Sequence, residues 1–137
     1  MGALTSHIMD VRSVPAGAAP VYAYRFDWNT PILGGKLYSP HTIEIPFVFD
    51  NASTKAGVVM TGSEQEKATL TDTVSSAWME FARTGKPAAQ GLPEWPAYTV
   101  TGRESMYIDI TSRISAYMAP SMVDFFHNML WTRAGLK

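Results

Sequence analysis

Hydrophobic and polar positions follow their clearest pattern at residues 21–28. Aromatic side chains occupy every second position of this segment: Tyr22, Tyr24, Phe26 and Trp28. A period of two in aromatic residues is typical of a β-strand. Because Val21 and Ala23 make the other face apolar where the strand begins, the pattern predicts a strand covered on both faces, as in the middle of an α/β sheet. A weaker alternation predicts a short second strand at 105–110.

Two later segments have helical periodicity instead. A single apolar stripe predicts a helix that begins at a capping box of Ser63 and Glu66 and ends at Gly85; the stripe contains Leu70, Val74, Ala77, Trp78 and Phe81. A second helix is predicted to open at Pro120 and Ser121, where the stripe contains Met122, Phe125, Phe126, Met129 and Leu130. Lys86-Pro87 forbids continuation of the first helix.

The remaining segments are rich in residues that break helices. Within residues 1–20 the pattern is weak, and Pro15, Gly17 and Pro20 predict that no helix forms. Residues 29–63 are a long, irregular connection, which in a small domain is usually functional or disordered. We expect an ordered, packed loop with a helical turn at 42–47, because it carries three apolar residues that should be buried: Phe47, Val48 and Phe49. Trp95 is predicted to be a packing anchor.

Composition narrows the class of protein. The chain has 137 residues, enough for about one domain. Its 12% aromatic and 17% charged content argues against intrinsic disorder, and the low charge indicates that part of the surface is covered. Lys plus Arg number 11 and Asp plus Glu 12, so the net charge of -1 argues against nucleic acid as a partner.

The sequence also restricts cofactors and location. Cysteine is absent, which excludes disulfides, thiolate zinc sites and a cysteine nucleophile. No apolar run is long enough for a transmembrane helix, so no membrane partner is expected. Residues 1–10 lack the pattern of a signal peptide, which leaves a cytoplasmic or a secreted location open.

Three histidines are the candidates for chemistry. His7 and His127 are predicted to be structural or surface residues, and no His-x-x-x-His or Glu-x-x-His pair suggests a metal site. His41 follows Pro40 in a loop that precedes the apolar residues 45–49. A loop anchored in this way can hold an imidazole in one orientation, as a general base requires. The alternative is a structural histidine in a packed loop.

The residues around His41 resemble the histidine loop of the type-B carboxylesterases, the family of para-nitrobenzyl-type esterases and cholinesterases. The resemblance is carried by residues 22–28, by Leu33-Gly34-Gly35 and by Pro40-His41-Thr42-Ile43-Glu44-Ile45-Pro46-Phe47-Val48-Phe49. A later block is similar to the C-terminal stretch of the same family: Ala77-Trp78, Phe81-Ala82-Arg83-Thr84-Gly85-Lys86-Pro87 and Leu92-Pro93-Glu94-Trp95-Pro96-Ala97-Tyr98. The match covers about residues 20–110.

This resemblance implies an α/β fold. Residues 1–137 would form a single C-terminal segment of an α/β-hydrolase domain, with few strands, two main helices, a long histidine-bearing loop and an incomplete sheet. The family uses a Ser, Glu and His triad in that chain order, and His41 matches the triad histidine. It would take the proton from the nucleophilic serine and return it to the leaving alcohol. The resemblance implies neither a cofactor nor a metal ion.

The chain departs from the family in what it lacks. None of its serines has glycine at both the second position before and the second position after, as a nucleophile elbow requires. The triad acid normally lies upstream of the histidine, and we interpret Glu44 as a carboxylate that braces the loop. We therefore expect a carboxylic-ester hydrolase fragment that supplies His41 and is inactive without the N-terminal part carrying Ser and Glu.

The partner of such a fragment would be the N-terminal portion of the same esterase, and the substrate of the complete enzyme a small carboxylic ester. Without that portion, the strand at 21–28 would have open edges and an uncovered aromatic face, which favours self-association. An alternative function is a non-catalytic interaction module derived from the esterase fold, although retention of His41 in its full motif argues against it. No specific feature supports a stand-alone binder of small ligands.

Overall fold

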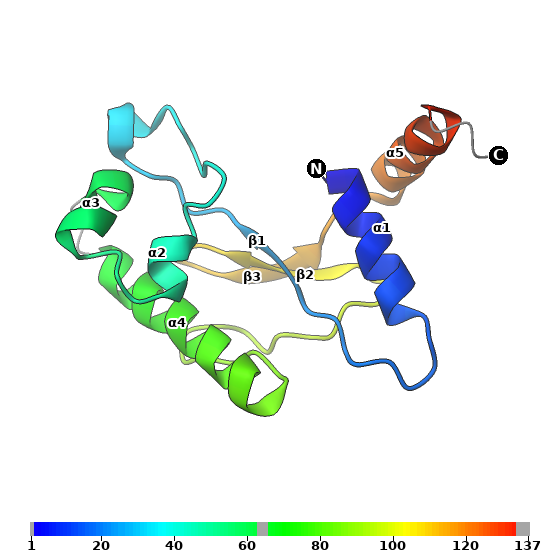
Figure 1. The fold of residues 1–137 in the computed structure, drawn as a ribbon, viewed down its shortest axis with the longest axis horizontal. Helices are drawn as coiled ribbons and strands as arrows, with labels where there is room; N and C mark the ends of the chain where they lie inside the picture. Colours follow the sequence, from blue (N-terminus) through cyan, green and yellow to red (C-terminus); the bar gives the residue numbers. More distant parts are fainter. Residues whose placement is uncertain (1, 63–65, 134–137) are drawn as a thin grey trace. The chain divides into compact units, whose positions relative to one another are not determined.

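The computed structural model describes residues 2–62 and 66–133 (Figure 1). In chain order the elements of these residues are α1 (Gly2–Ser13), β1 (Ala23–Phe26), the 3-10 helix η1 (Ile32–Gly35), α2 (Ile45–Val48), α3 (Lys55–Thr61), α4 (Glu66–Thr84), β2 (Glu104–Ile108), β3 (Arg113–Ala116) and α5 (Pro120–Arg133). The predicted α/β class is therefore confirmed, with more helices than the periodicity indicated.

Contacts divide the chain into two compact units. Unit 1 consists of Met1–Ala23, Pro96–Ser105 and Ser115–Lys137, and unit 2 of Tyr24–Trp95 and Met106–Ile114. His41 belongs to unit 2. The expectation of a single segment over 1–137 stays a prediction, since these units are defined by contacts within the chain alone.

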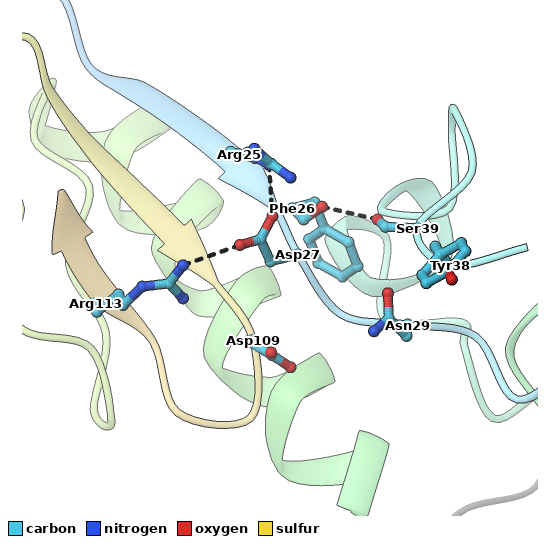
Figure 2. A pocket seen from close by; sticks show the side chains of 8 residues that line it. All are labelled: Arg25, Phe26, Asp27, Asn29, Tyr38, Ser39, Asp109 and Arg113. Atoms are coloured by element: carbon cyan, nitrogen blue, oxygen red, sulfur yellow. Dashed lines mark hydrogen bonds and ion pairs between the residues drawn. The ribbon is translucent and has the colours of Figure 1, made fainter. Parts of the chain in front are cut away.

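The sheet has three strands in the order β1-β2-β3. Figure 2 shows β1 and β2 pointing the same way and β3 pointing back beside β2. Just beyond β1, the Asp27 amide donates to the Ile108 carbonyl at 2.8 Å. The predicted place of residues 21–28 in the middle of a sheet is wrong for this sheet, because β1 is an end strand and no further strand of the described residues pairs with its outer edge.

Helices cover the aromatic face of β1. The Tyr24 ring meets the Trp78 ring of α4 edge-on, with 4.9 Å between centroids, and Phe26 and Trp28 both contact Phe47 of α2. The expectation that this aromatic face would be uncovered is therefore wrong, since α2 and α4 pack against it. On the opposite face Ala23 is buried in an apolar cluster where the strand begins, as predicted. Further along the same face Arg25 is exposed above the buried Tyr107 of β2, so the apolar cover does not extend over the whole strand.

The long helix confirms most of its predicted stripe. Leu70, Val74 and Ala77 are buried, and Gly85 has φ +76°, the left-handed conformation that ends a helix. Phe81 is the exception, since it is exposed in the last turns of the helix. Trp95 is buried and contacts Trp78, as a packing anchor should. Ser63 of the predicted capping box lies outside the described residues.

Residues 29–62 are ordered, as predicted, but contain more structure than expected. The helical turn predicted at 42–47 is confirmed in shifted form as α2, and α3 was not predicted. Phe47 is fully buried, whereas Phe49 is 72% exposed, so its predicted burial is wrong. The reason is helical geometry: residues two apart in a helix point to nearly opposite sides, and Phe47 takes the inward one.

A close approach fixes the start of α3 against the preceding loop. A Cβ atom added at Gly57 would lie 2.2 Å from the Asn51 carbonyl oxygen and 2.8 Å from the backbone of Ala52. Both obstacles are backbone atoms that cannot rotate away. We expect Gly57→Ala to lower the free energy of unfolding by about 1–3 kcal/mol in urea denaturation. Val59→Ala on the exposed side of the same helix should change it by less than about 0.5 kcal/mol, and equal effects would contradict this packing.

Unit 1 contains the largest difference from the sequence prediction. Residues 2–13 form α1, where no helix was expected, and Pro15 lies beyond its end rather than within it. Met9 of α1 is buried with Ala23 and Tyr98. The Tyr98 hydroxyl donates to the Asp10 carboxylate at 2.6 Å, and Arg103 forms an ion pair with the same carboxylate. These contacts stabilise a helix whose own sequence is a weak helix former.

The second predicted helix is confirmed as α5, which contacts α1 (Figure 1). Its predicted stripe is only partly buried. Met122 and Phe125 are exposed, whereas Val123 is 2% exposed and faces inward. The side chain of Leu130 lies outside what the structure describes.

Candidate functional site

His41 is exposed on the connection between β1 and α2. The connection runs from the carboxyl end of β1 through η1 and returns toward the end of β1 before α2 begins. In sheets with parallel strands, ligands bind beyond the carboxyl ends of the strands, and this connection starts at such an end. The imidazole is exposed, and its loop begins at the end of the sheet where ligands usually bind.

The backbone on the N-terminal side of His41 is fixed to β1. The Ser39 hydroxyl donates to the Phe26 carbonyl at 2.8 Å, and the Thr30 amide donates to the Tyr38 carbonyl at 2.9 Å. Since the Asp27 amide bonds toward β2, the carbonyl of the preceding residue, Phe26, points to the outer edge of β1. Ser39 therefore ties the loop to that outer edge two residues before His41.

The C-terminal side is fixed by burial. The Ile43 amide donates to the Pro40 carbonyl at 3.1 Å, which closes a turn around His41, and the Ile43 side chain is buried. Phe47 then anchors α2 against the aromatic residues of the β1 segment. Thr42 has φ +75°, a left-handed conformation that is costly for a β-branched residue and persists where the surroundings enforce it. Such strain is typical of functional loops.

We expect the hydrogen bond from the Ser39 hydroxyl to the Phe26 carbonyl to contribute measurably to the free energy of unfolding. Ser39→Ala removes a hydrogen bond to a strand carbonyl and should lower the free energy of unfolding by about 0.5–1.5 kcal/mol in urea. Ser75→Ala is the matched control, because its hydroxyl donates at 3.3 Å to the Asp72 carbonyl within α4 and ties no loop. The control should shift the value by less than about 0.5 kcal/mol. A loss in the control as large as that of Ser39→Ala would contradict the tie.

Glu44 is half-buried at the N-cap position of α2, but its side chain makes no capping hydrogen bond. Partial burial, and after it the negative charge of Glu44, raise the pKa of the Tyr24 phenol. The Tyr24 phenol therefore stays protonated to a higher pH than an ordinary tyrosine. No hydrogen bond of the described residues shows Glu44 bracing the loop, so that role stays a prediction.

A polar pocket of about 550 Å³ lies next to the loop (Figure 2). It is lined by Arg25, Phe26, Asp27, Asn29, Tyr38, Ser39, Asp109 and Arg113. In Figure 2 Arg25 and Arg113 both reach toward Asp27, at 2.6 and 3.2 Å. One carboxylate thus pairs with two guanidinium groups and joins the segment after β1 to β3. His41 does not line this pocket.

The other two histidines belong to unit 1, whereas the loop belongs to unit 2. His7 is half-buried on α1 of unit 1, and His127 lies on α5 with a side chain outside what the structure describes. In residues 2–62 and 66–133 no three His, Asp or Glu side chains come together as metal ligands would. None of the helices in those ranges combines the length and the apolar content that a membrane crossing requires.

Comparison with known proteins places this loop in a family. The model of the carboxylesterase family matches residues 4–126, a wider range than the 20–110 suggested by the motifs. The chain belongs to the carboxylesterase family. The para-nitrobenzyl esterase of Bacillus subtilis is 37% identical over 91 residues, and carboxylesterase 5A of Felis catus is 32% identical over 117 residues. The predicted resemblance is confirmed.

Solved carboxylesterase structures agree with the predicted fold. A thermophilic PNB esterase superposes with a TM-score of 0.68 at 32% identity, over 80% of this chain and 22% of that one. The two relatives named above are covered over 18% and 21% of their length. The chain therefore spans about a fifth of the proteins it matches, and its fold is part of an α/β-hydrolase.

The sequence singles out His41 as a candidate but does not indicate the contacts that hold its loop. The Ser39 tie and the strained backbone of Thr42 were not predicted, nor was the bridge that Asp27 makes between two arginines. Nothing in the sequence indicates the left-handed conformation of Thr42, since the residue types that favour this conformation are glycine and asparagine. Pro40 beside Ser39 was the available hint that the loop is rigid at this point.

Proposed function

We propose that this chain supplies the general-base histidine, His41, of a serine carboxylesterase whose nucleophilic serine and acid lie on polypeptide outside these 137 residues. The substrate would be a small carboxylic ester. The observation that carries the proposal is the exposed imidazole on a loop that is fixed on both sides, by Ser39 before it and by Ile43 and Phe47 after it.

This arrangement suits proton transfer. As the serine oxygen attacks the ester carbonyl carbon, the imidazole takes the hydroxyl proton. When the bond between that carbon and the alcohol oxygen breaks, the imidazolium returns the proton to the leaving alcohol. Water then attacks the acyl-enzyme, its proton passes to the imidazole and back to the serine oxygen, and the carboxylic acid leaves. Each transfer needs an imidazole of fixed orientation and an open face toward the serine.

Two observations support a serine and an acid outside the chain. No serine of the sequence has the glycine pair of a nucleophile elbow, which exposes the hydroxyl on a strained turn. The chain also spans only about a fifth of its relatives, so most of their residues have no counterpart here. An imidazole without these groups would hydrolyse esters only feebly.

The test is a chimera. The segment of the Bacillus subtilis para-nitrobenzyl esterase that matches this chain is replaced by residues 1–137, and hydrolysis of p-nitrophenyl acetate is measured. We expect the chimera to hydrolyse the ester, and the isolated 137-residue chain to show no comparable rate. A chimera carrying His7→Ala should keep its activity, because His7 belongs to unit 1 whereas the loop belongs to unit 2.

The proposal fails if the chimera folds with a cooperative melting transition and yet hydrolyses the ester no faster than the isolated chain. In that case the alternative of a non-catalytic interaction module would be favoured. The next measurement would then be the binding of the chain to other proteins.

A further inference from the structure

His41 occupies the second position of a hydrogen-bonded turn of four residues, Pro40-His41-Thr42-Ile43. The Ile43 amide donates to the Pro40 carbonyl at 3.1 Å, which closes the turn. Thr42, at the third position, has φ +75°, whereas φ at His41 is not positive. A positive φ at the third position alone defines a type II β-turn, in which glycine or asparagine normally occupies that position. The turn that presents the imidazole therefore carries a threonine where its backbone favours glycine.

Threonine is a costly residue type at such a position. Five non-glycine residues within 2–62 and 66–133 have a positive φ, and Thr42 is the β-branched one among them. At positive φ the Cβ atom crowds the preceding carbonyl oxygen, and a branched side chain has few rotamers with which to avoid it. The relaxed alternative for threonine is a type I turn, which has negative φ at both central positions. The two turns differ by about a half-turn of the peptide group between His41 and Thr42.

A side-chain hydrogen bond holds this peptide group in the strained turn. The Thr42 hydroxyl donates to the carbonyl of His41, which belongs to that peptide group. The Thr42 carbonyl accepts from the Ile45 amide at 3.1 Å, and the Ile43 side chain is buried, so the chain after the turn is fixed as well. Rotation of the peptide group to the type I form would carry the His41 carbonyl away from the hydroxyl.

The same rotation would change the direction of the imidazole. The second residue of the turn has ψ of about +120° in type II and about -30° in type I. Because burial of Ile43 and Phe47 anchors the chain that follows, a change of about 150° in ψ at His41 would point the ring in a different direction. A general base must lie within about 2.6–3.2 Å of the atom that gives up the proton. The type I turn would therefore take the base out of reach of a serine oxygen.

We propose that Thr42 is a positioning residue for His41, because its hydroxyl holds the His41 carbonyl and keeps the turn in the type II form that orients the imidazole. The proposal rests on the proposed function, since the orientation of the ring matters only if a serine oxygen gives its proton to it. Thr42 acts through the backbone of His41 and not on the ester. Its loss should therefore lower kcat and leave KM nearly unchanged.

Three substitutions in the esterase chimera separate the hydroxyl from the shape of the backbone. Thr42→Val keeps the branched side chain without the hydroxyl, so kcat for p-nitrophenyl acetate should fall about 10-fold, with KM within about 2-fold. Thr42→Ser restores a hydroxyl donor, and Thr42→Gly makes the type II turn favourable without one, so both should keep kcat within about 3-fold.

Thr84→Val is the matched control for the loss of a hydroxyl. It removes a hydroxyl that donates to the Glu80 carbonyl at 2.9 Å at the end of α4, in the same unit as the loop. Its kcat should stay within about 2-fold of the parent chimera. All four variants should melt within about 5 °C of the parent, so that a change in kcat does not report unfolding.

Nuclear Overhauser effects in the isolated 137-residue chain measure the turn without an assay of esters. In a type II turn the α-hydrogen of the second residue lies close to the amide hydrogen of the third, and in a type I turn the two are further apart. The effect between these hydrogens of His41 and Thr42 should be strong in the parent chain. It should stay strong in Thr42→Ser and, at the residue in place of Thr42, in Thr42→Gly, and be weaker by about 2-fold or more in Thr42→Val.

Equal kcat in the parent and Thr42→Val chimeras, or an unchanged Overhauser effect in Thr42→Val, would overturn the proposal. So would a loss in Thr42→Gly as large as that in Thr42→Val, because the hydroxyl would then act on the substrate and not on the turn. Folded chimeras that are all inactive, while the Overhauser effects follow the expected order, would contradict the proposed function and support the control of the turn by Thr42. An active parent chimera without differences among the variants would contradict only the role of Thr42.

Discussion

His41→Ala is expected to lower the kcat/KM of the esterase chimera for p-nitrophenyl acetate by about 10³-fold or more. The reason is that alanine offers no atom to receive the serine proton, so the attacking oxygen must lose it to water. The residue is exposed, so its removal should leave the melting temperature of the chimera nearly unchanged. A steady-state assay of p-nitrophenol release measures this loss of kcat/KM directly.

His7→Ala provides the comparison, because it removes an imidazole of the same chain from unit 1. Its activity should stay within about 2-fold of the parent chimera. If His41→Ala and His7→Ala had similar small effects, His41 would be a structural residue of a packed loop. If both abolished activity together with the melting transition, the loss would report unfolding, and the chimera's circular dichroism would show it.

Phe47→Ala is expected to cost about 3–5 kcal/mol of unfolding free energy. Phe47 is fully buried and contacts both Phe26 and Trp28, so its loss leaves a cavity between α2 and the β1 segment. The contact also anchors the loop on the C-terminal side of His41. Urea denaturation followed by tryptophan fluorescence is a suitable measurement, because Trp28 lies against the deleted ring.

Phe49→Ala is the control for this prediction. It removes the same side chain two residues further along, from a position that is largely exposed. We expect a change of less than about 0.5 kcal/mol in the isolated chain. Similar losses for the two alanine variants would mean that burial does not distinguish these positions, and the assignment of Phe47 as the anchor would be wrong.

The most reliable predictions came from long periodic segments. The stripe of Leu70, Val74 and Ala77 spans two turns and has a glycine stop after it, so few other structures could bury it. The aromatic alternation of 22–28 predicted a strand equally clearly. It could not show that the strand has only four residues or lies at the end of its sheet, because pairing depends on segments distant in sequence.

The elements that were missed share a dependence on tertiary contacts. Residues 2–13 are weak helix formers, and α1 is stabilised by Met9 and Asp10 through residues about ninety positions away. The seven residues of α3 contain a glycine and two valines, which do not favour a helix by themselves. Its one sequence signal was Thr54, whose hydroxyl accepts from the Gly57 amide at the N-cap.

Part of the candidate site could likewise be predicted from the sequence, and part depends on tertiary structure. His41 could be singled out because its neighbours match a family motif, which records spacing along the chain. The accessibility of its imidazole depends on where η1, α2 and the end of β1 lie in space. That Phe49 faces outward while Phe47 faces inward required only a four-residue helix, but a run of three apolar residues is equally compatible with a strand or a loop.

The discontinuous composition of unit 1 has a consequence for synthesis on the ribosome. Asp10 and Tyr98 are separated by 88 positions, and α1 also contacts α5 near the far end of the described chain. The helix α1 therefore emerges long before Tyr98, which buries Met9 together with Ala23, is synthesised. Most of unit 2 is continuous from 24 to 95 and can begin to pack during translation. A nascent chain paused before residue 96 would present α1 as an unassembled, chaperone-accessible segment.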